Sequence, residues 1–148
     1  MSEVVKRIKE LSSDVFEKIK QMKNPTLKAP VRSLQNVKYD EKDGFFELRG
    51  KEKVRTLTAS TVKTFAQTLL MMSLSKELIE SDDMATKREA YYVSKNWEDA
   101  RFKEQPESDS VMDDIEAMMR FNREQMKFIP EEKGGEVAGQ LVVIDKDP

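Results

Sequence analysis

Hydrophobic residues recur at every third or fourth position through the first part of the chain, which predicts an amphipathic helix over residues 3–23. A Ser-Ser-Asp run at residues 12–14 could interrupt this helix with a second N-cap. Asn24 ends it, because the residue before Pro25 is pushed out of the helical region. The apolar stripe of this helix suits a protein core and consists of Val4, Ile8, Leu11, Val15, Ile19 and Met22.

The next part of the chain predicts a β-hairpin between two polar connections. Residues 37–39 and 45–48 are predicted as its strands, on either side of a turn over residues 40–44. The Asp43-Gly44 pair supplies the left-handed backbone that a tight turn needs. Residues 26–33, which contain a proline, are predicted as a loop. The charged run at residues 51–55 is predicted as a solvated connector.

Three further helices are predicted, each from a residue that can cap a helix N-terminus. Thr58 opens a long helix to about Glu80, which is apolar around most of its circumference and is therefore expected to be central and buried. A capping box at Thr86–Glu89 opens a short helix to about Trp97. A similar signal at Ser110–Asp113 opens a third helix, which is expected to bury Val111, Met112, Ile115, Met118 and Met119.

The end of the chain predicts β-structure. Met126–Ile129 and Val137–Ile144 are short apolar runs around a Gly-containing turn. Three helices followed by a hairpin is the order of a winged helix-turn-helix of the CAP type. The predicted class is therefore α+β, mainly helical, with a helix and a hairpin over residues 1–55 before a winged helix over residues 56–148. The order alone is not specific, since many three-helix units bind no nucleic acid.

Composition excludes several kinds of chemistry. The 148 residues contain no Cys and no His, so thiolate catalysis, Ser-His pairs and the commonest transition-metal ligand are ruled out. There is no long apolar run that could span a membrane and no signal peptide, so a cytoplasmic location is expected. The 26 basic and 28 acidic residues nearly balance. Residues 1–32 carry eight cations and four anions, whereas residues 98–148 carry seven and fourteen, so polyanion contact is expected mainly from the first hundred residues.

A cluster on the short helix could carry chemistry. Arg88, Tyr92 and Lys95 follow a spacing of four and three, which places them on one helix face. Such a face could hold a phosphate beside a phenol. A neighbouring guanidinium would favour the phenolate and stabilise charge on a pentacoordinate phosphate. The alternative is structural, because tyrosine pairs such as Tyr91-Tyr92 are commonly half-buried with solvated hydroxyls.

The same residues carry a family resemblance. The run Ala85-Thr86-Lys87-Arg88-Glu89-Ala90-Tyr91-Tyr92 resembles the active-site motif of the A subunit of type IIB topoisomerase (topoisomerase VI) and of the related meiotic double-strand-break transesterases. Further segments are similar and in the same order, so that the resemblance runs from about Pro25 to Asp147. They are Pro30–Val37, Tyr39–Glu41, Phe65–Leu70, Ser108-Asp109, Asp113–Glu116, Lys133-Gly134, Val137–Gly139 and Ile144-Asp145.

The resemblance implies roles for individual residues. Tyr92 is the implied nucleophile, forming a 5′-phosphotyrosyl link and releasing a 3′-hydroxyl, and Arg88 is its electrostatic partner. Tyr91 lies where the family has Tyr or Phe, so its hydroxyl is expected to be dispensable. Glu89 has a sufficient role in the capping box. Further DNA contacts are expected from Lys95, Arg120, Arg123 and Lys127, although the last three could equally be cations that stabilise a helix C-terminus.

The resemblance also implies partners and cofactors beyond this stretch of sequence. Double-stranded DNA is the implied substrate, and the intact enzyme is expected to be an A2B2 assembly in which the B subunit hydrolyses ATP. The first helix is then a candidate interface with that subunit. Mg²⁺ is expected in a following Toprim domain, so we expect no metal site here, interpret the chain as a fragment, and expect it to be inactive or nearly so alone. The alternative function is a non-catalytic winged-helix DNA-binding or scaffold module.

Overall fold

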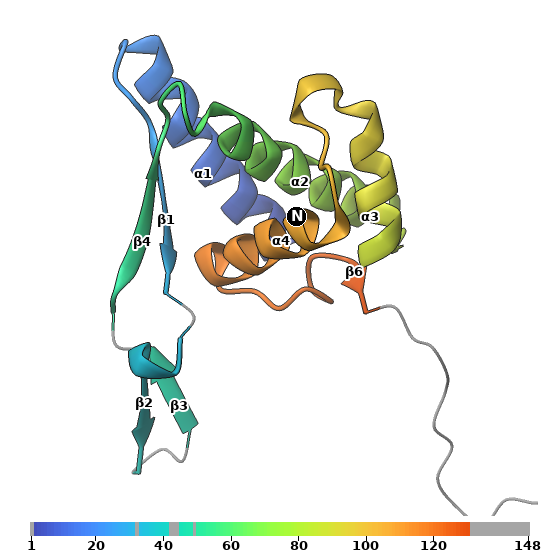
Figure 1. Cartoon of the computed structure of the whole chain (residues 1–148). Helices are drawn as coiled ribbons and strands as arrows, with labels where there is room; N and C mark the ends of the chain where they lie inside the picture. Colours follow the sequence, from blue (N-terminus) through green and yellow to red (C-terminus); the bar gives the residue numbers. More distant parts are fainter. Residues whose placement is uncertain (1, 32, 42–44, 49, 131–148) are drawn as a thin grey trace, which may run out of the picture.

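The computed structural model describes residues 2–31, 33–41, 45–48 and 50–130. Four α-helices make up most of it: α1 (Glu3–Lys20), α2 (Val62–Ser81), α3 (Lys87–Val93) and α4 (Gln105–Met119). Short strands accompany them, so the expected class, mainly helical α+β, is confirmed. Figure 1 shows the helices gathered into one layered body with a thin β arm along one side. None of the helices in the described part is long and apolar enough to cross a membrane.

Helix α1 is continuous through the Ser-Ser-Asp run, so the possible interruption there does not occur. The helix ends at Lys20, earlier than predicted, because Met22 adopts a left-handed backbone (φ 55°) that turns the chain toward the first strand. The buried residues of α1 are Val4, Val5, Ile8 and Val15. Phe16 and Ile19 near its end are exposed, as is Met22 beyond it, so only part of the predicted stripe is core.

The two polar connections are strands, which corrects the prediction of a loop and a solvated connector. β1 (Thr26–Pro30) pairs antiparallel with β4 (Glu52–Thr56). The reason is that one face of this ladder is packed on α4: Leu27 and Ala29 are buried there. Two cations of this charged run are bound by one carboxylate, since Asp114 Oδ2 lies 2.9 Å from Arg55 Nη2 and 3.3 Å from Lys53 Nζ. Pro30 is tolerated because it ends an edge strand.

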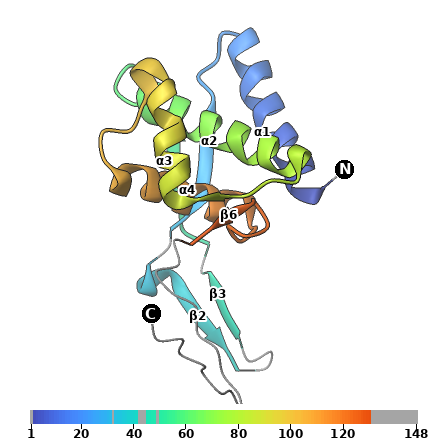
Figure 2. The same cartoon turned by 90° about the vertical axis from the view of Figure 1, so that its right-hand side faces the viewer.

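The predicted hairpin is confirmed. β2 (Val37–Asp40) pairs antiparallel with β3 (Phe45–Leu48), and the turn residues 42–44 lie outside the described residues. A short 3₁₀ turn, η1 (Leu34–Asn36), precedes it. The fully buried Asn36 ties the hairpin to the β1–β4 ladder, with its Nδ2 donating to the Val31 carbonyl at 2.8 Å and its Oδ1 accepting from the Lys51 N–H at 3.1 Å. Figure 2 shows the hairpin extending away from the helices.

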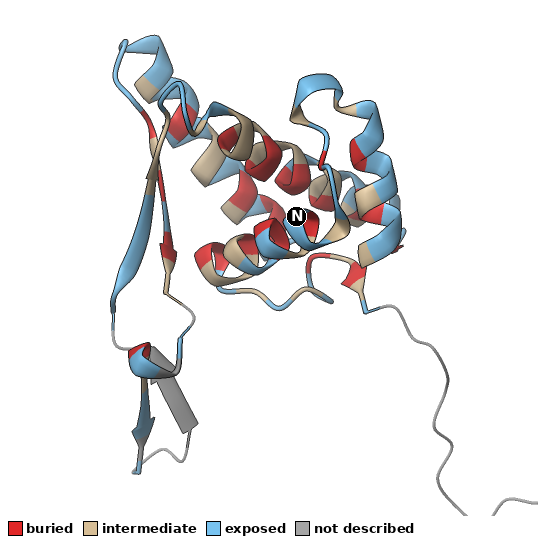
Figure 3. Cartoon of the chain, in the orientation of Figure 1, coloured by how far each residue is buried: buried red, intermediate tan, exposed pale blue. Residues whose placement is uncertain are grey.

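Helix α2 is the central helix that the pattern predicted, and Figure 3 shows buried positions along its length. It begins at Val62 rather than after Thr58. The Thr61 hydroxyl donates to the Thr56 carbonyl at 2.5 Å and accepts from the Thr58 N–H at 2.9 Å, which holds residues 58–61 in a turn before the helix. At the other end Asp82 is the left-handed C-cap (φ 55°).

Helix α4 begins at Gln105, five residues before the predicted start. Pro106 lies in its first turn, where a proline lacks no hydrogen bond and is favoured, so the proline belongs to the helix and not to a loop. Its buried face is the predicted one. Arg120 ends it in a left-handed conformation (φ 60°).

Two short strands link the end of the described chain to α3. β5 (Ala85–Thr86) pairs in parallel with β6 (Phe128–Ile129). β6 lies within the first strand predicted for the wing, whereas the second, Val137–Ile144, lies outside the described residues. One hydrophobic core runs from α1 through α2, α3 and α4, so it crosses the boundary predicted near residue 55.

Candidate active site on helix α3

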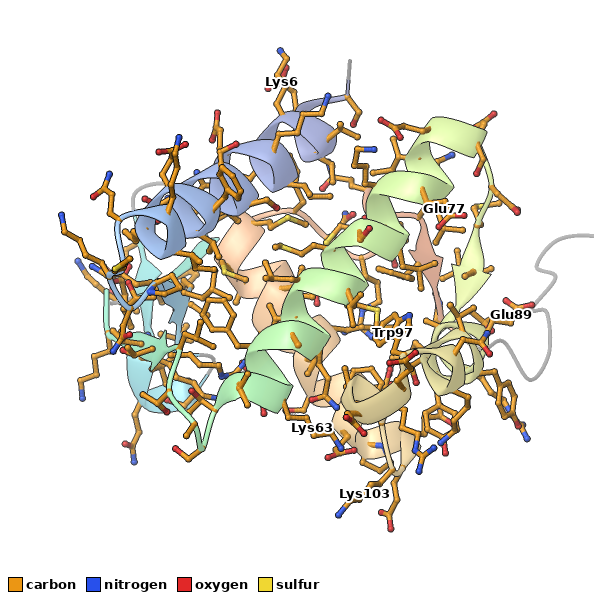
Figure 4. The ribbon with its side chains drawn as sticks, turned by 90° about the horizontal axis from the view of Figure 1, so that it is seen from above. Lys6, Lys63, Glu77, Glu89, Trp97 and Lys103 are labelled. Carbon is orange, nitrogen blue, oxygen red and sulfur yellow. The ribbon has the colours of Figure 1, made fainter. Side chains whose placement is uncertain are left out.

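The short helix α3 is started by the predicted capping box. The Thr86 hydroxyl accepts from the Glu89 N–H at 3.1 Å, and Glu89 Oε2 accepts from the Thr86 N–H at 2.6 Å. Hydrogen bonding from the Thr86 backbone N–H and side chain holds the pKa of the Glu89 carboxyl below its ordinary value, because it favours the charged form. Glu89 lies at the outer edge of the molecule (Figure 4), in the structural role expected for it.

The structure brings Arg88 and Tyr92 together. Arg88 Nε donates to the Tyr92 hydroxyl at 3.2 Å, and the guanidinium carbon lies 5.7 Å from the centre of the phenol ring. Both side chains are exposed, Tyr92 to 52%. A phenol beside a guanidinium at an open surface is accessible to a phosphodiester, since a guanidinium offers paired donors to phosphate oxygens.

Lys95, which spacing placed on the same face, is directed elsewhere. Its Nζ lies 4.0 Å above the Tyr91 ring and donates to the Phe102 carbonyl at 2.8 Å. The cause is local, because α3 ends at Val93 and continues as the tighter 3₁₀ turn η2 (Ser94–Asn96), which rotates the following residues.

The two adjacent tyrosines differ in environment, which spacing alone could not show. Tyr91 is half-buried, and its hydroxyl donates to the Lys103 carbonyl at 3.1 Å. Its ring lies 5.5 Å from the Tyr92 ring at a tilt of 48°. Tyr91 is thus a packed residue and Tyr92 an accessible one.

The other cations expected to contact DNA lie beyond the last residue of α4, which corrects their placement on that helix. Arg123 Nη2 binds Asp113 Oδ1 at 2.6 Å and Glu116 Oε2 at 3.2 Å, and its side chain is only 17% exposed. Lys127 Nζ binds Asp82 Oδ1 at 2.8 Å. Arg120 is exposed and is the C-cap itself. Arg123 and Lys127 therefore take part in intramolecular ion pairs.

Sequence reasoning missed the segment that receives Tyr91 and Lys95, residues 102–103. The contact uses backbone carbonyls, which leave no trace in a side-chain pattern. The one available signal was Phe102, a single large apolar residue within an otherwise polar stretch, and it is fully buried.

The described residues contain no cluster of three or more acidic, His or Cys side chains that could hold a metal ion. We therefore derive no step of a reaction through Mg²⁺ from these residues.

Proteins of one family resemble this chain. Residues 63–128, which include α3 and α4, match the family model described as type IIB DNA topoisomerase. The chain is 47% identical over 142 residues to the A subunit of type 2 DNA topoisomerase 6 from Methanocaldococcus jannaschii, covering 96% of this chain and 38% of that protein. This chain is homologous to the topoisomerase VI A subunits.

Two further relatives of the same name support the relationship. That of Pyrococcus abyssi is 33% identical over 147 residues, covering 96% of this chain and 38% of the relative. That of Methanothermobacter thermautotrophicus is 31% identical over 144 residues, covering 97% of this chain and 40% of the relative. The chain thus spans about two fifths of the length of the topoisomerase VI A subunits it matches. The family resemblance seen in the sequence is confirmed.

Proposed function

We propose that this chain carries the DNA-cleaving tyrosine of a topoisomerase VI A subunit, and that Tyr92 is that tyrosine. The observation that carries the proposal is the 3.2 Å hydrogen bond from Arg88 to the hydroxyl of an exposed Tyr92. The homology supports it, because it covers the helix on which both residues lie.

The proposed reaction is a transesterification. The Tyr92 oxygen attacks a backbone phosphorus, the bond from phosphorus to the 3′-oxygen breaks, and the 5′-phosphate remains linked to the tyrosine. The phenol loses one proton and the leaving 3′-oxygen gains one, so the products are a phosphotyrosyl ester and a 3′-hydroxyl. Arg88 would stabilise the charge that develops on the phosphate oxygens. Since one phosphate ester replaces another, the same groups can reseal the strand.

The partner subunits, the ATPase and the metal site that this reaction requires are proposed to lie outside the described residues. The proposed assembly pairs two A subunits with two ATP-hydrolysing B subunits on double-stranded DNA. Mg²⁺ would be held by a Toprim domain. On this proposal the 148-residue chain alone cleaves DNA poorly or not at all.

The test compares the two tyrosines in the full-length protein containing this sequence, assembled with its B subunit in the presence of Mg²⁺ and ATP. We expect Tyr92→Phe to abolish the covalent DNA–protein adduct and Tyr91→Phe to retain it, because the exposed Tyr92 hydroxyl contacts Arg88 whereas the Tyr91 hydroxyl donates to the Lys103 carbonyl. If Tyr91→Phe is the inactive variant, the assignment of the nucleophile is wrong. Cleavage by both variants would place the nucleophile elsewhere. No adduct from the parent enzyme, together with salt-sensitive DNA binding that Tyr92→Phe leaves unchanged, would support a non-catalytic module instead.

A further inference from the structure

A side chain from α3 and one from the 3₁₀ turn η2 that follows it converge on one stretch of backbone. The Tyr91 hydroxyl donates to the Lys103 carbonyl at 3.1 Å, and Lys95 Nζ donates to the Phe102 carbonyl at 2.8 Å and to the Lys103 carbonyl at 3.4 Å. The ammonium group also lies 4.0 Å above the Tyr91 ring, within the range of a cation–π interaction. The two residues thus form one unit, which we call the Tyr91–Lys95 clamp.

The backbone that the clamp holds is itself anchored. Phe102 is fully buried, and its ring lies 5.7 Å from that of Trp97. The Lys103 N–H donates to Glu107 Oε2 at 2.6 Å, in the first turn of α4. The clamp therefore joins the site helix to the start of α4 through residues 102–103.

Helix α3 needs such support because it is short. It has seven residues, and a helix of that length is not stable by itself. Only Ala90 within it is buried. A further tie to α4 is the 3.4 Å ion pair between Lys87 and Asp109, at the first residue of α3.

The clamp also reaches the proposed nucleophile. The Tyr91 ring lies 5.5 Å from the Tyr92 ring, so it supports one side of that ring. A change in the position of Tyr91 would therefore move the phenol that Arg88 contacts. Reacting groups tolerate little displacement, and a misplacement of about 1 Å can cost about 10²-fold in rate.

We propose that Lys95 and Tyr91 are positioning residues that hold Tyr92 in its attacking geometry, and that Lys95 does not contact DNA phosphates. This inference rests on the proposed function. Lys95 has three N–H donors and no acceptor, and its ammonium group is directed at two carbonyls and a ring. A phosphate contact would require it to leave all three.

The test uses Lys95→Met in the assembled enzyme with its B subunit, and Lys103→Met as the matched control. The Lys103 side chain points outward (Figure 4) and its ammonium has no hydrogen bond or ion pair with the described residues, so this control removes a neighbouring cation and keeps the carbonyl. We expect Lys95→Met to lower the single-turnover cleavage rate at saturating DNA by about 10-fold while Kd for DNA changes less than about 2-fold. Lys95→Arg should restore most of the rate, because a guanidinium can donate to the same carbonyls. Lys103→Met should change neither quantity.

Three results would overturn the inference: a normal rate for Lys95→Met, a loss confined to DNA affinity, or an equal effect of Lys103→Met. If Lys95→Met fails to fold, Tyr91→Phe decides, since it removes one clamp hydrogen bond and keeps the ring. A rate reduced by about 2- to 5-fold at saturating DNA is expected for it, and an unchanged rate would contradict the clamp. Tyr92→Phe in the same assay tests the proposed function separately. Cleavage by that variant would refute the nucleophile, whereas an inactive Tyr92→Phe beside a normal rate for Lys95→Met would refute the clamp alone.

Discussion

Arg88 and Arg123 are the same residue type in two regions of one small molecule, and the molecule uses them differently. Arg88 is exposed on α3 and donates to a neutral phenol. Arg123 is largely buried between the carboxylates of Asp113 and Glu116. Burial alone would lower the pKa of Arg123, but the hydrogen bonds and charges of the two carboxylates outweigh it and raise that pKa. The first arginine has the phosphate-contacting role in the proposed function, whereas the second joins the end of α4 to the segment that follows it.

The two arginines differ in how far along the sequence their partners lie. The partner of Arg88 lies four residues away on the same helix, so helical periodicity places it. The partners of Arg123 lie seven and ten residues away in sequence, across the turn that follows α4. A cation beyond a helix end is therefore assigned to DNA only after its neighbours in the fold are known.

The largest effect that tests this comparison is expected from Arg88→Ala in the assembled enzyme. Loss of one preorganised charge stabiliser typically costs about 10²–10³ in rate, or roughly 3–4 kcal/mol. DNA affinity should fall much less, because many phosphate contacts share the binding. Stability should change by less than about 0.5 kcal/mol, as for most exposed positions. Single-turnover cleavage, equilibrium DNA binding and thermal melting measure the three quantities.

Two outcomes would contradict the role proposed for Arg88. Normal cleavage by Arg88→Ala would remove the guanidinium from the reaction. A large drop in melting temperature would instead show that Arg88 is structural, and the tyrosine pair would then be better explained as packing.

Arg123→Ala should have the opposite effect to Arg88→Ala: it should lower stability and leave the cleavage rate unchanged. It removes two charged hydrogen bonds in a partly buried setting and leaves two acidic side chains near each other. We expect a loss of roughly 1–3 kcal/mol in the free energy of unfolding. Cleavage per folded molecule should be unchanged. Denaturant unfolding of the chain and cleavage below the melting temperature check both points. Weaker DNA binding by a folded Arg123→Ala enzyme would instead restore Arg123 as a phosphate contact.

The features that could be predicted from the sequence are those formed by residues close together along the chain. The capping box of α3, the contact between Arg88 and Tyr92, the hairpin and the central helix all depend on residues close in sequence, and all are present. The β1–β4 ladder was missed because its strands are more than twenty residues apart and β4 is charged. The direction of Lys95 was missed because it depends on a switch from α to 3₁₀ geometry and on two backbone carbonyls.

A smaller effect concerns the start of α3. The pKa of Glu89 is lowered in the folded chain, so its charge contributes stability above the unfolded pKa of roughly 4.3, and that contribution is lost as pH falls through the folded value. Glu89→Gln keeps an acceptor oxygen without the charge. We expect it to be less stable than the parent chain by about 0.5 kcal/mol at pH 7, since the group is exposed and screened. The deficit should vanish at about pH 3.

Melting temperatures at both pH values check this, with Glu77→Gln as the control. Glu77 is an exposed glutamate on α2 whose carboxylate has no hydrogen bond or ion pair with the described residues (Figure 4). A Glu89→Gln deficit that persists unchanged at about pH 3 would mean that the carboxylate charge does not stabilise α3.

The smallest effect is expected at Arg120, three residues before Arg123. Unlike Arg88 and Arg123, this arginine is the C-cap of a helix. Its backbone is left-handed (φ 60°) as the C-cap of α4, a conformation that costs an L-residue about 1–2 kcal/mol. Glycine adopts it without strain but loses about 0.5–1 kcal/mol more in conformational entropy on folding. Arg120→Gly should therefore raise the free energy of unfolding by a few tenths of a kcal/mol, whereas Arg120→Ala should not. Denaturant unfolding of both variants measures these free energies. A loss of stability in Arg120→Gly would show that the side chain, and not the backbone, fixes this helix end.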